Sequence, residues 1–192
     1  VTSLAGVPYN YEIILRLGID RLKIPSITKM TQAGGKLSNE KIYKINSTLR
    51  QKNIRFYTMY GQTEATARIS YLSPGDIDKK LGSIGKVIPD GKIWIQDKQG
   101  KIIEQVDSIG ELVYSGENVS MGYAISISDL RLGDLNNGIL RTGDLARFDN
   151  DGYFFIEGST NRFVKIYGNR VSLYSLEKII LDKGFESAII GD

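Results

Sequence analysis

The residues best suited to chemistry lie in the sequence YTMYGQTEAT at positions 57–66, where a short apolar run stops at a glycine. Thr63 carries a hydroxyl that can donate a hydrogen bond to a phosphate, and Glu64 carries oxygens of the kind that Mg²⁺ prefers. Open α/β sheets bind ligands at the carboxyl ends of their strands, and this motif follows such a predicted strand. A helix cap explains the same residues equally well, with Thr63 at the N-cap and Glu64 in the first turn.

Two more polar sites beside glycines fit a nucleotide or another phosphorylated ligand. Gly34 and Gly35 follow a predicted strand in QAGGKLS, where they would let a ligand approach the backbone, although a tight turn would also use them. Asp144 lies inside the β-type run LRTGDLARF, where an aspartate is unfavourable unless something accepts it. Two adjacent ribose hydroxyls are suitable donors, and a bulge or turn is the alternative.

Composition excludes several kinds of chemistry. The 192 residues include no cysteine and no histidine, which rules out disulfides, thiolate nucleophiles, thiolate zinc sites and imidazole bases. Carboxylates, hydroxyls, lysine, arginine, backbone groups and a hard metal ion are left. These groups favour electrostatic and positioning catalysis, on which phosphate chemistry relies. The lack of cysteine also fits a cytoplasmic protein.

Charge and hydrophobicity are those of a soluble globular domain. Hydrophobic residues make up 41% of the chain and charged residues 24%, and 25 basic side chains outnumber 22 acidic ones by a net charge of +3. This small, dispersed excess favours a solvated surface, so we expect no nucleic-acid partner. We also expect no membrane span, because no apolar run approaches the ~18 residues that a span needs.

The elements that must position these residues change character near Pro74. Residues 1–80 read as α/β, and strand, helix, strand at this spacing predicts a parallel pair joined by a crossover. The predicted elements are a short helix at 9–18 closed by Gly18, a strand at 26–35, an amphipathic helix at 37–53 capped by Ser38, a strand at 54–60, and a helix from about Glu64.

Residues 81–158 consist of short β-type runs separated by Asn-Gly, Asp-Gly and similar turns, which predicts an antiparallel β subdomain, a sheet or small distorted barrel. In 159–192 a charged stretch is followed by a helical pattern from Leu173. About 34 residues cannot bury a core of their own. We therefore expect the incomplete start of a C-terminal domain.

The order and spacing of these motifs are more specific than any one of them. A glycine pair after a strand, then YGQTE, then GEL with GYA, then TGD, then VKIYGNR resembles the second half of the AMP-forming, acyl-activating superfamily. That group contains acyl-CoA synthetases, the adenylation domains of nonribosomal peptide synthetases and beetle luciferases. The chain is most similar to bacterial acyl-CoA-synthetase-like ligases, and the resemblance covers nearly all of it.

The resemblance implies specific roles for the candidate residues. Tyr60 would stack on or beside adenine, Asp144 would bind the ribose hydroxyls, and Thr63 and Glu64 would be catalytic, with Glu64 holding Mg²⁺. Asn161 would be the hinge, and Gly168 would lie near the path of the coenzyme A thiol. The implied nucleotide-binding set is Gly34, Gly35, Lys36, Tyr60, Gly61, Gln62, Thr63, Asp144 and Lys165.

Family members join a small-molecule carboxylate to ATP, release pyrophosphate, and pass the acyl group from AMP to a thiol. The resemblance therefore implies part of a ligase that uses ATP, Mg²⁺ and coenzyme A, in the cytoplasm and in fatty acid metabolism. Two motifs of the family are outside the chain, a phosphate loop upstream and a catalytic lysine in the small domain. We expect a fragment that completes no turnover alone.

Two positions depart from the family pattern, and two other functions stay open. Ser159 stands where an arginine is usual, and a hydroxyl cannot replace its fork. Asn161 stands where the hinge is usually aspartate or lysine. The alternatives are an adenylation enzyme that loads a carrier protein, and a catalytically inactive nucleotide-binding module. A basic RNA-binding domain ranks below both, because no aromatic-basic cluster is evident.

Overall fold

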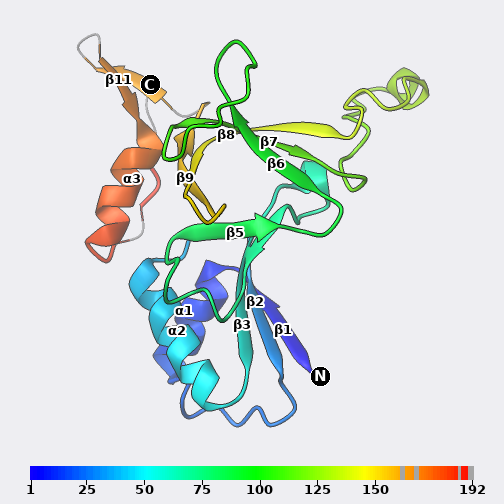
Figure 1. Ribbon diagram of the computed structural model, residues 1–192. Helices are drawn as coiled ribbons and strands as arrows, with labels where there is room; N and C mark the ends of the chain where they lie inside the picture. The colour runs from blue at the N-terminus through cyan, green and yellow to red at the C-terminus, as the bar shows by residue number, and fades with distance from the viewer. Residues whose placement is uncertain (161–162, 167–168, 186, 190–192) are drawn as a thin grey trace.

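A computed structural model describes residues 1–160, 163–166, 169–185 and 187–189. In the described residues a nine-stranded mixed sheet runs through the protein in the order β1-β2-β3-β4-β5-β9-β8-β7-β6, and β10 and β11 form a separate pair (Figure 1). The nine strands of the sheet are β1 (Ser3–Gly6), β2 (Lys29–Gln32), β3 (Arg55–Tyr60), β4 (Ser70–Leu72), β5 (Ser83–Val87), β6 (Lys92–Gln96), β7 (Gly110–Ser115), β8 (Ile139–Phe148) and β9 (Phe154–Ser159).

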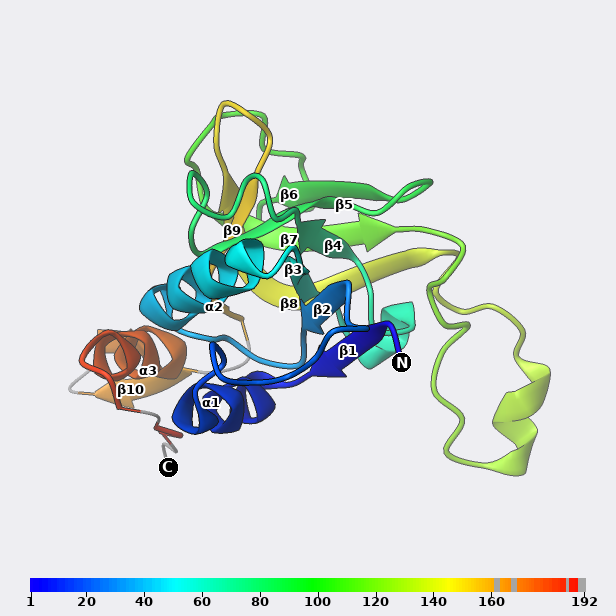
Figure 2. The ribbon, with the colours of Figure 1, turned by 90° about the horizontal axis from the view of Figure 1, so that it is seen from below.

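The first three strands are parallel, and two helices cover one face of them. These are α1 (Pro8–Leu17) and α2 (Asn39–Gln51), which lie on the same side of the sheet (Figure 2). Side chains of both helices pack in one apolar core against Met30 of β2 and Phe56 of β3. The largest contributors to this core are Tyr11, Met30, Ile45, Leu49 and Phe56.

Local sequence signals placed these helices correctly. The predicted helices at 9–18 and 37–53 are α1 and α2, and the predicted parallel pair is β2 and β3. Gly18 ends α1 with φ of 80°, in the left-handed region that glycine enters readily. The Ser38 hydroxyl accepts a hydrogen bond from the Lys41 amide at 3.4 Å and begins α2. Strand β1, which pairs with β2, was not predicted.

The predicted helix from about Glu64 is wrong. A single 3₁₀ turn, η1 (Thr63–Ala65), is followed after a short turn by β4, which runs antiparallel to β3. The chain cannot continue as a helix because Thr66 and Ala67 have positive φ values of 47° and 66°. It instead turns back over Gly61, where an added Cβ would lie 2.5 Å from the Ala67 carbonyl oxygen. The N-cap position of η1 belongs to Gln62, not Thr63.

The prediction of a small closed barrel is also wrong, because the sheet stays open. Strands β5 to β9 are antiparallel as expected, but they continue the sheet that β1 to β4 begin, through the pairing of β4 with β5. At the far edge, within the described residues, β6 pairs with β7 and makes only an isolated bridge from Gln96 to Ile102. The sheet is therefore open, and the division at about residues 80 and 158 stays a prediction.

The last described part of the chain lies beside β9. It comprises β10 (Phe163–Ile166), β11 (Asn169–Ser172) and α3 (Leu173–Asp182), the last of which is the helix predicted from Leu173. The Lys178 ammonium of α3 contacts Glu157 of β9 at 3.3 Å, which fixes the helix against the sheet. A second 3₁₀ segment, η2 (Ile127–Arg131), lies in a long excursion between β7 and β8 that projects from the sheet (Figure 1).

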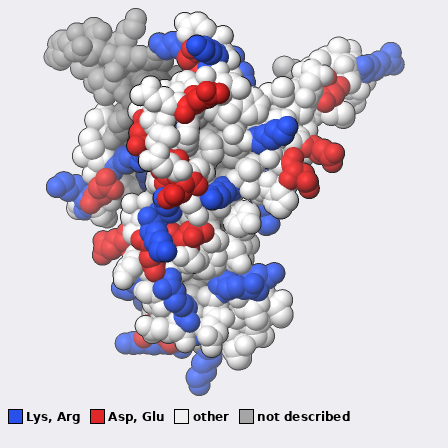
Figure 3. Space-filling model, in the orientation of Figure 1, with Lys and Arg blue, Asp and Glu red and all other residues white. Residues whose placement is uncertain are grey.

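The surface is mixed in charge. On the face that Figure 3 shows, basic and acidic side chains of the described residues are interspersed. None of the described helices combines the length and the apolar character that crossing a lipid bilayer requires.

Gly85 allows the sheet to bend where its two regions join, and its replacement tests that bend. It has φ of +82°, and an added Cβ would lie 1.8 Å from the Tyr71 carbonyl oxygen. We expect Gly85→Ala to lower the free energy of unfolding by about 3 kcal/mol, from backbone strain and displacement of β4. Urea denaturation measures the loss.

Gly75→Ala is the matched control, because an added Cβ there meets nothing within 4 Å. Its effect should stay within about 0.5 kcal/mol. Equal stability of the two variants would contradict the assignment of Gly85 to the bend.

Candidate active site

A cavity of about 270 Å³ lies where the parallel and antiparallel regions meet. Six of the residues predicted from separate sequence motifs line it. Those six are Gly34, Gly35, Lys36, Tyr60, Gly61 and Asp144. The rest of the wall comes from Gln32, Leu37, Ile42, Thr58, Met59, Gly82, Ser83, Ile84 and Ile156. The cavity therefore lies at the carboxyl ends of β2 and β3, where a parallel sheet places a ligand.

The glycine pair forms one wall of the cavity with exposed backbone. Gly34 and Gly35 have φ values of +77° and +152°, so a side chain at either position would be strained. The buried Gln32 holds this turn, because its Nε2 donates a hydrogen bond to the Gly35 carbonyl oxygen at 2.8 Å. The turn thus offers a flat backbone surface to a ligand.

Asp144 lines the same cavity and is held by two side chains, one from the last residue of β3 and one from the segment that follows it. The Tyr60 hydroxyl donates a hydrogen bond to Asp144 Oδ2 at 2.6 Å. Gln62 Nε2 lies 3.3 Å from the same oxygen and donates a shorter bond, of 2.8 Å, to the Thr142 carbonyl oxygen. The two halves of the predicted nucleotide site are therefore in direct contact.

The backbone around Asp144 is fixed by hydroxyl groups. The Asp144 amide donates to Thr142 Oγ1 at 3.1 Å, and that hydroxyl donates to the Leu112 carbonyl oxygen at 2.8 Å. Gly143, with φ of 71°, presents a carbonyl oxygen that accepts bonds from the Thr160 amide at 2.6 Å and the Ser159 hydroxyl at 3.1 Å. The bulged strand β8 is thus locked in place on both sides of Asp144.

Burial dominates the electrostatics of this pair. Burial raises the pKa of the Asp144 carboxyl, and the hydrogen bonds from Tyr60 and Gln62 oppose that rise. Burial, together with the neighbouring Asp144 carboxylate, also raises the pKa of the Tyr60 hydroxyl, so Tyr60 acts as a donor. The arrangement suits a carboxylate that accepts further hydrogen bonds from a ligand.

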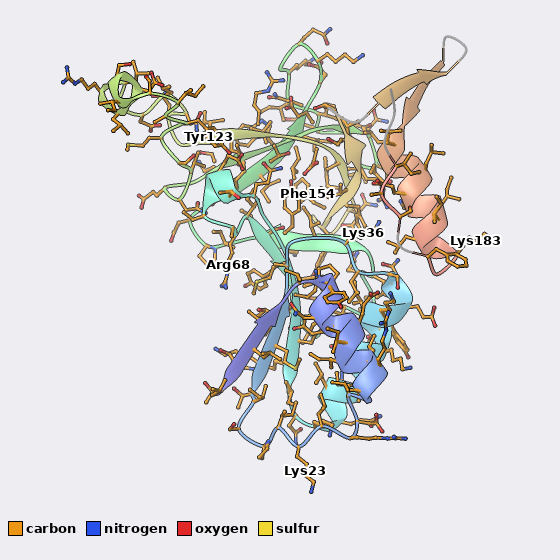
Figure 4. All side chains as sticks on the ribbon, turned by 180° about the vertical axis from the view of Figure 1, so that it is seen from behind. Lys23, Lys36, Arg68, Tyr123, Phe154 and Lys183 are labelled. Atoms are coloured by element: carbon orange, nitrogen blue, oxygen red, sulfur yellow. The ribbon has the colours of Figure 1, made fainter. Side chains whose placement is uncertain are left out.

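Thr63 and Glu64 lie beside the cavity and do not line it. Both belong to η1, which follows Gly61 directly. The Tyr123 hydroxyl donates a hydrogen bond to Glu64, and this bond lowers the pKa of the Glu64 carboxyl (Figure 4). Asn118 Nδ2 donates to the Ala65 carbonyl oxygen at 2.6 Å and keeps the turn against the loop after β7. The lowered pKa favours the ionised form of the Glu64 carboxyl.

Glu64 fits a magnesium ion that arrives with a nucleotide. It is partly exposed, and in the described residues no group of three or more aspartate, glutamate, histidine or cysteine side chains converges to form a protein-only cage. Mg²⁺ is commonly held by one or two carboxylates together with substrate phosphates and waters. A single carboxylate beside the cavity satisfies that description.

Lys36 connects the cavity to the C-terminal helix. It lines the cavity and also a hollow shared with Glu177, Lys178 and Leu181 of α3. Burial lowers the pKa of the Lys36 ammonium, and the nearby Lys178 lowers it further. A movement of α3 would therefore change the charge environment of the cavity.

Three predicted positions cannot be placed at the cavity. Asn161 and Gly168 lie outside the described residues. Lys165 belongs to β10, where the backbone is described and the side chain is not. Their roles stay predictions, as do the roles of the residues that line the cavity.

Gln32, Thr58 and Tyr123 are among the residues of the site that sequence reasoning missed. Gln32 and Thr58 are polar residues at inward-facing positions of β2 and β3, 3% and 6% exposed. Polar residues within the apolar alternation of a strand are the signal that would have found them. Tyr123 lies in the GYA motif, but its contact with Glu64 joins residues 59 positions apart, and no local pattern predicts that.

Comparison with known proteins identifies the family. A profile of the family described as AMP-binding enzyme matches residues 1–124. The chain belongs to this family of adenylate-forming enzymes. It is 29% identical to 4-hydroxybutyrate–CoA ligase 1 from Metallosphaera sedula, covering all of this chain and 34% of that protein. It is 32% identical to bacitracin synthase 2 from Bacillus licheniformis, covering 72% of this chain and 6% of that protein.

The fold is shared with o-succinylbenzoate CoA synthetase from Bacillus subtilis, at 26% identity. The structure with an acyl-adenylate intermediate gives a TM-score of 0.77 over 95% of this chain and 36% of that one. The structure with ATP and a magnesium ion gives 0.76 over 96% and 37%. This chain thus spans about a third of the length of the CoA ligase and the CoA synthetase, and 6% of bacitracin synthase 2. It resembles acyl-CoA ligases over that third.

Thr58 offers a test of the cavity wall. Among the described residues its Oγ1 is buried without a hydrogen-bond partner. An unsatisfied buried hydroxyl destabilises a protein, so Thr58→Val should raise the free energy of unfolding by about 1 kcal/mol in the ligand-free protein. Thr31→Val, on the neighbouring strand and less buried, is the control and should change stability by under about 0.5 kcal/mol. A destabilised Thr58→Val would mean that the hydroxyl has a partner in solution.

Proposed function

We propose that the protein containing this chain is an ATP-dependent acid–thiol ligase, which activates a carboxylate as an acyl-adenylate and transfers the acyl group to coenzyme A. The observation that carries the proposal is the contact of Tyr60 with Asp144 in a cavity that the Gly34–Gly35 turn also lines. Three motifs far apart in sequence thereby form one site. A phosphorylated ligand with a flat base and a diol matches the chemistry of its walls.

Each wall of the cavity has a part in binding the nucleotide. The backbone of Gly34 and Gly35 and the ring of Tyr60 would enclose adenine. Asp144 would accept hydrogen bonds from the ribose hydroxyls, because a carboxylate is acceptor-only and has two oxygens. Thr63, on the turn that follows, would donate its hydroxyl to a phosphate.

Glu64 would be the protein ligand of Mg²⁺, which when bound neutralises charge on the phosphates as pyrophosphate leaves. The hydrogen bond from Tyr123 keeps Glu64 ionised and oriented for this task. η1 needs no second charged side chain to bind the metal, because substrate phosphates and waters can complete the coordination shell of a magnesium ion.

Two thiol acceptors fit this proposal, coenzyme A and a carrier protein. Two of the relatives are named as CoA ligases or synthetases, which favours coenzyme A. The similarity to bacitracin synthase 2 favours the second candidate, an adenylation enzyme that loads a carrier protein. An inactive nucleotide-binding module is the third, because Ser159 stands where an arginine is expected. A fatty-acid-like carboxylate and a cytoplasmic location belong to the same proposal.

Asp144→Ala tests the nucleotide site. A hydrogen bond to a charged group contributes roughly 1.5–3 kcal/mol, so the variant should bind AMP about ten- to a hundredfold more weakly. Isothermal titration measures the loss. The unmutated protein should bind 2′,3′-dideoxy-AMP almost as weakly, and the two losses should not add, because both remove the same contact.

Asp20→Ala is the control, since Asp20 is exposed and does not line the cavity. It should leave AMP binding unchanged. Additive losses for Asp144→Ala and the dideoxy ligand, or no loss in the variant, would make Asp144 a structural residue of the bulge.

Glu64→Gln tests the metal site in the full-length protein. Removing one negative charge from the Mg²⁺ shell should slow carboxylate-dependent exchange of labelled pyrophosphate into ATP and raise the Mg²⁺ concentration for half-maximal rate, each about tenfold or more. Glu104→Gln, an exposed glutamate elsewhere on the chain, should change neither. An unchanged rate and Mg²⁺ dependence would remove Glu64 from the mechanism. No exchange with a broad panel of acids would favour the inactive module.

A further inference from the structure

The two oxygens of the Asp144 carboxylate have different surroundings. Oδ2 accepts the hydrogen bond from the Tyr60 hydroxyl at 2.6 Å and faces Gln62 Nε2 at 3.3 Å. Within the described part of the chain, Oδ1 accepts no hydrogen bond. One oxygen is thus held by the protein while the other is left for a ligand in the cavity that Asp144 lines.

Both donors come from the same short segment at the end of β3. Tyr60 packs its ring against two apolar clusters, one around Tyr114 and one around Leu112. Gln62 is tied to the backbone of β8 by its 2.8 Å bond to the Thr142 carbonyl oxygen. Neither donor can follow the carboxylate freely, so the two side chains set its orientation. An aspartate without them would rotate broadly about its terminal torsion.

We propose that the Tyr60 hydroxyl and the Gln62 amide are positioning groups, which fix Asp144 through Oδ2 so that Oδ1 meets the ribose hydroxyls of the bound nucleotide. The inference rests on the proposed function and adds a second role for Tyr60 beyond a surface beside the base. Affinity for the ribose then depends on Tyr60, because an oriented carboxylate binds the hydroxyls more tightly than one that rotates. The hydroxyl of Tyr60 acts through Asp144 and touches no reacting atom.

The charges around Asp144 support a pH-dependent readout. The titratable groups that line the cavity with it are Tyr60 from β3 and Lys36 from the turn after β2. The hydrogen bond from Tyr60 lowers the pKa of Asp144, in opposition to burial, so its removal should raise that pKa further. Ribose recognition needs the ionised carboxylate. It should therefore be lost at a higher pH in a protein that lacks the Tyr60 hydroxyl.

Tyr60→Phe in this chain tests the inference, because it keeps the ring and removes the hydroxyl. Isothermal titration with AMP and 2′,3′-dideoxy-AMP gives the ratio of their dissociation constants, which isolates the ribose contribution. We expect the unmutated chain to prefer AMP by about tenfold or more, and Tyr60→Phe to reduce that preference about three- to tenfold. Affinity for dideoxy-AMP should not change. On acidification, the preference for AMP should decline at a higher pH in the variant.

Tyr57→Phe is the matched control, since Tyr57 lies on the same strand but lines a different hollow on the opposite face. It should leave the ratio and its pH profile unchanged. Gln62→Met provides a second variant with a smaller expected reduction, because the Gln62 contact with Asp144 is the longer one. This variant decides the question if Tyr60→Phe does not fold.

The outcomes separate the inference from the proposed function. If AMP binds and Tyr60→Phe weakens both ligands equally, the tyrosine acts only through its ring or through stability, and the inference is overturned. The same holds if the ratio and pH profile do not change. If the unmutated chain binds neither ligand, the nucleotide site itself is wrong and the inference falls with it.

Discussion

The site depends on a sheet that curls without closing. Tyr60 and Asp144 are 84 positions apart in sequence, and three strands, β4, β5 and β9, separate their strands in the sheet. Neighbouring strands are ~4.8 Å apart, so a flat sheet would hold β3 and β8 roughly 19 Å apart. A hydrogen bond of 2.6 Å between their side chains requires the sheet to turn back on itself. Gly85 permits this bend, because only a residue without a Cβ lets β5 approach the Tyr71 backbone so closely.

The curl also explains why polar groups are buried at the site. Apolar side chains from both regions fill the inside of the bend, and Tyr60 packs against both of the clusters there. Asp144 is enclosed by the same bend, which makes its negative charge unfavourable until donors reach it. Tyr60 and Gln62 supply two, and the proposed ribose would supply more. Thr58, whose buried hydroxyl has no partner among the described residues, lies on the same wall. These buried polar groups lower the stability of the ligand-free protein, and a bound ligand would offset that loss.

Features fixed by neighbouring residues could be predicted from sequence, and features fixed by distant contacts could not. Ser38 and Gly18 mark helix ends through their own backbone and side-chain geometry, so α1 and α2 were predicted. Asp144 stood out because an aspartate within a β run needs a partner, yet the identity of that partner, Tyr60, depends on the curl. The false helix after Glu64 has the same origin, since positive φ at Thr66 and Ala67 lets the chain return over Gly61. Barrel closure failed as a prediction because turn signals specify hairpins and say nothing about whether the first and last strands meet.

Ser159, which stands where the family usually has an arginine, has a structural role in the curled sheet. Its position pairs directly with Asp144 between β8 and β9, so an arginine there could have reached a bound nucleotide. The hydroxyl of Ser159 instead donates to the Gly143 carbonyl oxygen, next to the Thr160 amide, and thereby fixes the bulge that presents Asp144. In the proposed nucleotide site Ser159 would therefore act through the backbone, and it would add no charge of its own. Under the proposed function, fewer protein groups would then bind ribose and phosphate, and Asp144 and the tyrosine that holds it would contribute more of the binding.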